Sequence, residues 1–333
     1  AALLTIGHLV DHFGGKKMLI AGQTVLSISF ISIIHVTNLQ AFLFLNILVG
    51  FSISTLHIAN NAQAFYDQDR GGKNLVVSAA GYWSAGSLLT TLLSMYLIGK
   101  VKLSTHITVL QIIVYVLSIA VILRRKETLI PSNRHDRVSR SIFNDLKKFN
   151  FDWMVNFGLI FGIMLEFAIG DWSTIFTKEN GGISGTWAPL PFLCFTMFMI
   201  VGRVSITQLR KRFKINRLVR FGGMLAGFSF LVGIWFIDQF GLTGLIISFS
   251  LAGLGSSFIG PSFLNIANTR INLPSSIVIG QISAVNVMLS WVLKQIIAFV
   301  AQVAGLQVAL TIPALMAISV GLFTRVFKPI PAK

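Results

Sequence analysis

Apolar runs long enough to cross a membrane follow one another along almost the whole chain. The hydrocarbon core of a bilayer is about 30 Å thick, so a spanning helix needs about 20 mostly apolar residues. Residues 1–10 are apolar but too short to span, and we interpret them as the second half of a helix. The sequence therefore predicts an all-α membrane protein that crosses the bilayer many times. Ten runs in the 333-residue sequence approach or exceed this length: 17–36, 40–66, 76–99, 105–123, 153–177, 186–206, 218–237, 242–267, 275–302 and 306–324.

The distribution of the basic residues predicts how the chain is oriented in the membrane. The net charge is +16, and nearly all of the Lys and Arg fall in alternate gaps between the apolar runs. Loops that carry Lys and Arg stay on the cytoplasmic side during insertion. We therefore expect the basic segment 125–150 and the C-terminus to be cytoplasmic, in a cytoplasmic (inner) membrane. The same charges can contact phospholipid headgroups, whereas a nucleic-acid partner is not expected.

The polar segment 125–150 divides the chain into two parts. A partial apolar run and four full ones precede it, and six follow. Internal similarity supports two related halves, because Gly50 opens GFSISTLHIANNAQ and Gly253 opens GLGSSFIGPSFLNIAN. We predict one helix bundle over 1–124 and a second over 151–333, joined by the segment between them. Repeated halves are typical of secondary transporters, which bind substrate near the middle of the membrane.

A short motif near the start of the chain resembles a family signature. Residues 7–17 read GHLVDHFGGKK. This resembles G-x-L-x-D-R-x-G-R-K-x, the loop between the second and third helices of the major facilitator superfamily. Gly7, Asp11, Gly14 and Lys16 match, while a histidine and a glycine replace two arginines. The resemblance implies the family's third to twelfth helices from this loop onward, in two six-helix bundles with pseudo-twofold symmetry. The first helix and part of the second would be missing.

The motif also suggests a gate between two conformations. Gly7 and Gly14 permit a close backbone approach and a tight reversal of the chain. Asp11 stands at a helix end, where it can accept hydrogen bonds from the N-terminus of a neighbouring helix. The alternative is an ordinary turn with a solvated carboxylate. The family resemblance implies an echo of the motif after the eighth helix. Gly202 and Arg203 fit that echo, but its acidic position holds a threonine.

Three further stretches resemble the sugar-permease branch related to the fucose permeases. They are residues 50–63 in the fourth helix, 81–86 at the start of the fifth and 166–173 in the seventh. The resemblance implies alternating-access transport of a small polar solute, such as a sugar, driven by a proton gradient. Two alternatives stay open. One is an exporter of the same fold, and the other is a membrane protein that does not transport, either a decayed remnant or a helix-packing partner.

Three ionisable residues are predicted to lie well inside the spans: Glu166, Asp171 and Lys294. A charge at the centre of a membrane helix costs roughly 2.5–3.5 kcal/mol on insertion scales, so such residues usually face a partner or a cavity. Lys294 can pair with either carboxylate, and the sequence leaves both pairings open. The pair can simply fix two helices, or one of the carboxylates can bind the coupling proton.

Two polar stripes predict helix faces that line a solute cavity, since amide side chains can bind sugar hydroxyls. Their residues recur at spacings of three or four, as one face of a helix requires. Small and polar residues also join membrane helices by packing, and this alternative stays open. The stripe on the fourth helix is Asn46, Gly50, Ser54, His57 and Asn61, flanked by Asn60 and Gln63; that on the eleventh is Gly280, Ser283, Val287, Ser290 and Lys294.

The sequence predicts no enzyme, no cofactor and no metal site. His8 and His12 stand at i and i+4 beside Asp11, but no further ligand set accompanies them. No phosphate-binding loop occurs, which excludes an ATP-driven pump within this chain. Cys194 stands alone in an apolar run and is interpreted as a packing residue. We expect a monomer whose partners are the bilayer, a small solute and protons.

Overall fold

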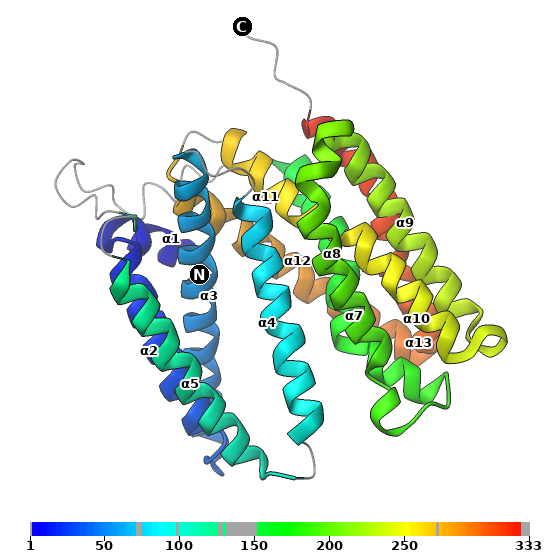
Figure 1. Cartoon of the computed structure of the whole chain (residues 1–333), viewed down its shortest axis with the longest axis horizontal. Helices are drawn as coiled ribbons and strands as arrows, with labels where there is room; N and C mark the ends of the chain where they lie inside the picture. The colour runs from blue at the N-terminus through cyan, green and yellow to red at the C-terminus, as the bar shows by residue number, and fades with distance from the viewer. Residues whose placement is uncertain are drawn as a thin grey trace, which may run out of the picture. The chain divides into compact units, whose positions relative to one another are not determined.

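The computed structural model describes residues 2–70, 75–97, 100–125, 129–130, 152–270 and 273–327 (Figure 1). These residues are almost entirely helical, and no strand occurs among them. The helices are α1 (Ala2–Phe13), α2 (Gly15–Ile33), α3 (Leu39–Asp69), α4 (Leu75–Leu97), α5 (Leu103–Arg124), α7 (Trp153–Glu179), α8 (Leu190–Arg212), α9 (Ile215–Trp235), α10 (Ile237–Ser256), α11 (Ile259–Arg270), α12 (Ser275–Ala304) and α13 (Leu306–Ser319). Two short 3-10 helices are η1 (Gly185–Trp187) and η2 (Val320–Phe327).

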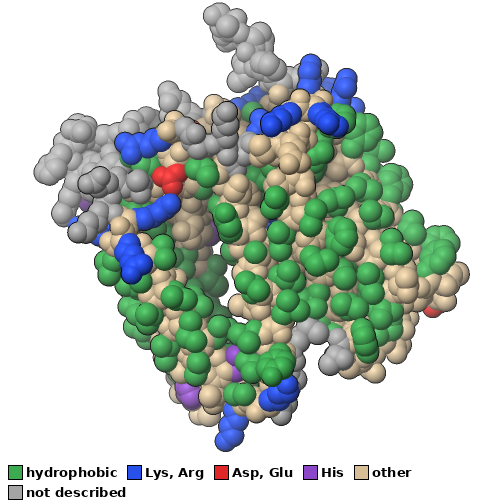
Figure 2. All heavy atoms as spheres, viewed as in Figure 1, with side chains coloured by type: hydrophobic (Ala, Val, Ile, Leu, Met, Phe, Trp, Pro, Cys, Tyr) green, Lys and Arg blue, Asp and Glu red, His purple; other side chains and the backbone are tan. Residues whose placement is uncertain are grey.

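The helices confirm an all-α protein that crosses a membrane many times. Within the described residues, nine spans are long and apolar enough to do so, and α10 with α11 forms one of them. Each of these spans lies on one of the predicted runs. The remaining run, 17–36, forms α2, which has 19 residues and carries Lys16, Lys17 and Gln23. Apolar side chains cover the flanks of the helices, where lipid would contact them (Figure 2).

The chain forms two compact units. Unit 1 consists of Ala1–Leu75, Leu93–Asn150 and Ile271–Ala284, and unit 2 of Val76–Leu92, Phe151–Arg270 and Val285–Lys333. Most of α4 therefore belongs to unit 2, and the first part of α12 to unit 1. The predicted linker over 125–150 lies almost wholly outside the described residues. The division into bundles over 1–124 and 151–333 thus stays a prediction.

Hydrogen bonds between helices join α2 to α5 in unit 1. The Gln111 amide donates to Ser27 Oγ at 2.9 Å. The hydroxyls of Thr24 and Tyr115 lie 3.4 Å apart. Such polar contacts stabilise helix pairs where lipid supplies no hydrophobic driving force. A polar residue such as Ser27 is therefore buried here without an unsatisfied group.

Unit 2 has an aromatic and aliphatic core between α7, α8, α9, α10 and α13. Phe176, Phe195, Phe230 and Phe249 are fully buried in it, and the last two rings lie 5.1 Å apart between centroids. Where α9 meets α13, a Cβ on either glycine of a G-x-x-x-G pair, residues 223–227, would strike a backbone carbonyl. The two backbones can touch only because these positions lack side chains. Helix α13 in turn packs on α7, the helix that carries Glu166 and Asp171.

Candidate functional site

Two ion pairs lie along α7, both within unit 2. Asp171 Oδ2 is 2.7 Å from Lys294 Nζ of α12, and these side chains are 44% and 39% exposed. Glu166 lies five residues earlier, about 7.5 Å along the helix axis. Its Oε2 is 3.4 Å from Arg203 Nη2 of α8. Of the two pairings that the sequence left open, the structure shows Asp171 with Lys294 and gives Glu166 a different cation.

Arg203 is buried, with 5% of its surface exposed, and it ties α8 to three other segments of unit 2. Nε donates to the backbone carbonyl of Ser257, just after α10, at 2.8 Å. Nη1 donates to the carbonyl of Ala80 in α4 at 2.8 Å and also to Ser84 Oγ. Together with Glu166, these acceptors surround the planar guanidinium, whose fork of donors suits such a set.

This position of Arg203 corrects the prediction that only three ionisable residues lie inside the spans. Helix α8 continues nine residues past Arg203 and ends at Arg212. The sequence interpretation grouped Arg203 with the basic residues that follow the helix, although it belongs to the span itself. One signal was available, since Arg203 lies inside the predicted run 186–206 and needs a buried anion there. The structure supplies Glu166 as that anion.

The second oxygen of the Glu166 carboxyl does not take part in the contact with Arg203. Its Oε1 is buried and has no hydrogen-bond partner among the described residues. A buried oxygen without a partner costs roughly 1–3 kcal/mol. Protonation at this oxygen would remove the charge without breaking any hydrogen bond made there. Chemically, Glu166 is a proton-acceptor position beside a buried cation.

The second ion pair borders an aromatic ring. Lys294 Nζ lies 5.2 Å from the centroid of the Phe167 ring, and Phe167 and Asp171 are both exposed on α7. An accessible ion pair facing hydrocarbon would be costly, which favours a wet or protein-covered face at this point. The group combines a donor, an acceptor and an apolar ring face. These are the features of a binding site for a polar solute.

Helix α3 carries the polar stripe that was predicted for the fourth helix. Its His57 contacts another helix. In unit 1, His57 Nε2 lies 3.3 Å from Ser283 Oγ, in the first part of α12. Its Nδ1 is 3.4 Å from the amide nitrogen of Asn61, which also donates to the His57 carbonyl at 2.8 Å. Asn60 is exposed next to them. Asn46 and Ser54 instead bond to carbonyls of their own helix.

Gln63 lies at the other end of this stripe and joins three segments of unit 1. Its amide nitrogen donates to Asp67 Oδ1 at 2.9 Å. Its Oε1 accepts from the backbone N–H of Ile130 at 3.0 Å, and the Ile130 carbonyl accepts from the N–H of Gly15 at 3.0 Å. Both the nitrogen and the oxygen of the Gln63 amide therefore hydrogen-bond to other groups of the protein. A role of Gln63 in solute binding stays a prediction.

The stripe on α12 does not lie on one exposed face. Val287 is exposed, whereas Gly280, Ser283 and Ser290 are buried. The sequence interpretation did not single out Asn286, which is buried and donates to Asn156 Oδ1 of α7 at 3.1 Å. Part of this helix thus uses its polar residues for packing, the alternative that the sequence left open.

The gate motif adopts the tight geometry that its glycines predict. Gly14 alone separates α1 from α2 and has a φ of 82°, which favours glycine. A Cβ on Gly7 would lie 2.7 Å from the carbonyl oxygen of Ser276, so α1 packs directly on the start of α12 within unit 1. Asp11 and Lys16 are half-buried. The gating role of this motif stays a prediction.

The echo of the motif in unit 2 is also a close-packed position. A Cβ on Gly202 would strike the side chain of Ser257, whose carbonyl accepts the hydrogen bond from Arg203. Gly202 and Arg203 therefore both contact Ser257, in the short segment between α10 and α11. Among the residues that the structure describes, no group of three His, Cys, Asp or Glu could hold a metal ion.

The spans and the ion pairs between them define a polytopic membrane protein. The family model described as Major Facilitator Superfamily matches residues 1–293. The chain belongs to the major facilitator superfamily, as its signature predicted, and is a transporter of that family. It is 23% identical over 333 residues to an uncharacterised MFS-type transporter of Yersinia pestis, covering 97% of this chain and 82% of that protein.

Solved structures of the superfamily share the fold. The fucose:proton symporter FucP of E. coli superposes with a TM-score of 0.72 at 15% identity, over 99% of this chain and 88% of that one. The human organic anion transporter MFSD10 gives 0.75 at 16% identity, over 97% and 80%. The proton:xylose symporter XylE gives 0.70 at 13%, over 98% and 83%. At such identities the likeness shows the fold alone.

Proposed function

We propose that this chain is a proton-coupled secondary transporter that moves a small polar solute, such as a sugar, by alternating access. Glu166 carries the proposal, because it is an intramembrane carboxyl with a cation at one oxygen and, among the described residues, no hydrogen-bond partner at the other. Ionisable groups placed in this way mark proton relays in transporters. Two of the fold neighbours are described as proton symporters of fucose and of xylose, which supports this class of solute and coupling.

The other hydrogen bonds of Arg203 lower the free-energy cost of protonating Glu166 reversibly. When the carboxyl takes up a proton, the guanidinium loses its anion but keeps three other acceptors, which lie in α4 and just after α10. A buried cation that retains such hydrogen bonds avoids part of the penalty of losing its ion pair. The protonated and deprotonated states can then lie within a few kcal/mol of each other, as a transport cycle requires.

In unit 2, the solute-binding groups that we propose are Asp171, Lys294 and Phe167. In unit 1, taken by itself, we propose His57, Asn60 and Asn61 as groups that can hydrogen-bond to a solute. The carboxylate accepts hydrogen bonds from solute hydroxyls, the ammonium donates hydrogen bonds, and the ring offers an apolar face. We propose that Gln63 acts indirectly, by fixing the end of α3. Asp11, with Gly7, Gly14 and Lys16, forms the proposed gate.

An exchange assay tests the solute class without needing a proton gradient. Proteoliposomes loaded with unlabelled L-fucose or D-xylose should take up the same labelled sugar. The variants Asp171→Asn and Lys294→Met should weaken uptake by about 5- to 150-fold, the factor for losing 1–3 kcal/mol of hydrogen bonding. Glu179→Gln, at the exposed end of α7, serves as the control. Exchange of p-aminohippurate instead of either sugar would contradict the proposed solute, and exchange of none would favour a non-transporting protein.

The orientation follows from where the basic helix ends lie. Arg124 ends α5, Arg270 ends α11, and three basic residues occupy the last turn of α8. We propose that these ends, the central segment and the C-terminus face the cytoplasm. Green fluorescent protein fused after Asn133 or Lys333 should fluoresce, whereas alkaline phosphatase there should be inactive. Both fusion sites lie outside the described residues. Active phosphatase at either site would reverse the orientation.

A further inference from the structure

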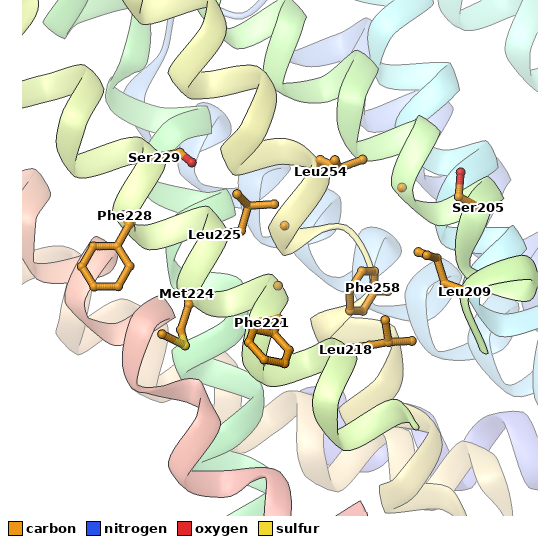
Figure 3. A pocket seen from close by; sticks show the side chains of 13 residues that line it. Ser205, Leu209, Leu218, Phe221, Met224, Leu225, Phe228, Ser229, Leu254 and Phe258 are labelled. Carbon is orange, nitrogen blue, oxygen red and sulfur yellow. The ribbon is translucent and has the colours of Figure 1, made fainter. Parts of the chain in front are cut away.

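Unit 2 carries an apolar groove between α8 and α9, with the end of α10 as its floor (Figure 3). Its volume is about 640 Å³. Phe221 and Phe228 of α9 stand exposed along it. Apart from the hydroxyls of Ser205 and Ser229, its lining side chains are apolar. The groove is lined by Gly202, Ser205, Leu209, Leu218, Phe221, Gly222, Met224, Leu225, Phe228, Ser229, Leu254, Gly255 and Phe258.

The length of the groove matches one leaflet of a bilayer. On α9 it extends from Leu218 to Ser229, which is about 16 Å of helix. The hydrocarbon core is about 30 Å thick, so one leaflet contributes about half of that. The groove therefore has the depth and the polarity for a lipid acyl chain that lies along α9.

Cations gather at one end of the groove. Leu209 lines it, and residues 210–212 follow directly as Arg-Lys-Arg in the last turn of α8. Lys214 precedes α9 as its N-cap, and Arg217 follows in the first turn, next to the lining residue Leu218. Figure 2 shows Lys and Arg side chains gathered at this end of α8 and α9. No Asp or Glu occurs between Glu179 and Asp238, so α8, α9 and their connection contribute no counter-charge.

We propose that this groove binds an acyl chain of an anionic phospholipid, whose headgroup is held by the cations of the α8–α9 connection. An apolar groove about one leaflet deep that ends in a cluster of Lys and Arg side chains, with no Asp or Glu on α8 or α9, is complementary to such an amphiphile. A soluble anion would use the charges and leave the groove open, and a zwitterionic lipid would use the groove without neutralising the charges. The site lies outside the ion pairs of α7 and does not depend on what the protein transports.

Lipid retention by the purified full chain tests the proposal. The protein is extracted in mild detergent, incubated with equal amounts of phosphatidylglycerol and phosphatidylcholine, and analysed by native mass spectrometry. Wild-type protein should retain phosphatidylglycerol preferentially. The triple variant Lys211→Gln, Arg212→Gln, Lys214→Gln should lose this preference by about fivefold per cation, roughly 100-fold in all. The double variant Lys100→Gln, Lys102→Gln, which removes charge at the α4–α5 connection, should keep it.

A second variant separates the groove from the charges. Ser205→Phe places a ring in the groove and should reduce retention of phosphatidylglycerol while leaving every cation in place. Ser229→Phe does the same from α9 if the first variant does not fold, as judged by gel filtration. Equal retention of both lipids by the wild type would overturn the proposal. So would unchanged retention in both the charge and the groove variants, or displacement of the lipid by inorganic phosphate alone.

Discussion

We expect that replacing Glu166 with glutamine abolishes accumulation of solute against its gradient while exchange of solute across the membrane continues. The amide keeps the shape of the side chain and can still accept a hydrogen bond from Arg203, but it cannot take up a proton. With one proton per solute, a pH difference of one unit, worth about 1.4 kcal/mol, supports at most about tenfold accumulation. We predict this ratio for the wild type and a ratio of about one for Glu166→Gln.

The measurement uses one preparation of proteoliposomes for both activities. Uptake of labelled sugar is followed under an imposed pH gradient, and exchange is followed without one. Glu179→Gln is the matched control, because it makes the same chemical change at the exposed end of the same helix. If Glu166→Gln accumulates sugar as the wild type does, Glu166 is a structural partner of Arg203 and the proton binds elsewhere.

We expect that replacing Arg203 with alanine strongly destabilises the protein. The substitution leaves the largely buried Glu166, whose side chain is 16% exposed, without its cation and removes the donors to the carbonyls of Ala80 and Ser257. Breaking a buried ion pair from one side costs roughly 3–5 kcal/mol. The double variant Glu166→Gln, Arg203→Met should recover part of that loss, because no unpaired charge then remains buried.

Unfolding in detergent measures this effect, and the more exposed ion pair between Arg270 and Asp152 provides the control. Arg270 Nη1 lies 3.0 Å from Asp152 Oδ2, but these side chains are 28% and 30% exposed. Arg270→Ala should therefore cost no more than about 1 kcal/mol, as is usual for accessible pairs. Equal unfolding midpoints for Arg203→Ala and Arg270→Ala would show that the Arg203 cluster contributes little to the fold.

The spans and the tight turn were predictable because each rests on local chemistry. A helix in hydrocarbon must present apolar side chains, so hydropathy alone located the nine spans in the described part of the chain. The reversal at Gly14 needs a positive φ, which only glycine adopts readily. The family signature around Asp11 added the identity of the fold. None of these inferences needed to know which helices are neighbours.

The partners of the ionisable residues were harder to predict, because they depend on helix faces and neighbours. Glu166 and Asp171 are five residues apart, which turns them by about 140° around α7. One therefore meets Arg203 of α8 and the other Lys294 of α12. This rotation was present in the sequence and argued against a single lysine serving both carboxylates. That α8 and not another helix lies beside Glu166 could be learned only from the structure.

The polar stripes show a further limit of spacing arguments. His57 and Gln63 both belong to or flank the stripe on α3, yet His57 meets Ser283 of α12 while Gln63 binds the backbone of Ile130. A common helix face does not give a common environment, because the neighbours change along the helix. Asn286 was missed for the same reason, since its partner Asn156 lies on α7.

Proton movement driven by solute tests proton coupling through Glu166 most directly. Proteoliposomes are prepared with a pH-sensitive dye inside and no initial pH gradient, and L-fucose or D-xylose is then added outside. We predict that wild-type vesicles acidify as sugar enters, with about one proton per sugar for a single titrating carboxyl, and that Glu166→Gln vesicles do not acidify although they exchange sugar. Sugar entry into wild-type vesicles without any change of internal pH would contradict a proton-coupled mechanism.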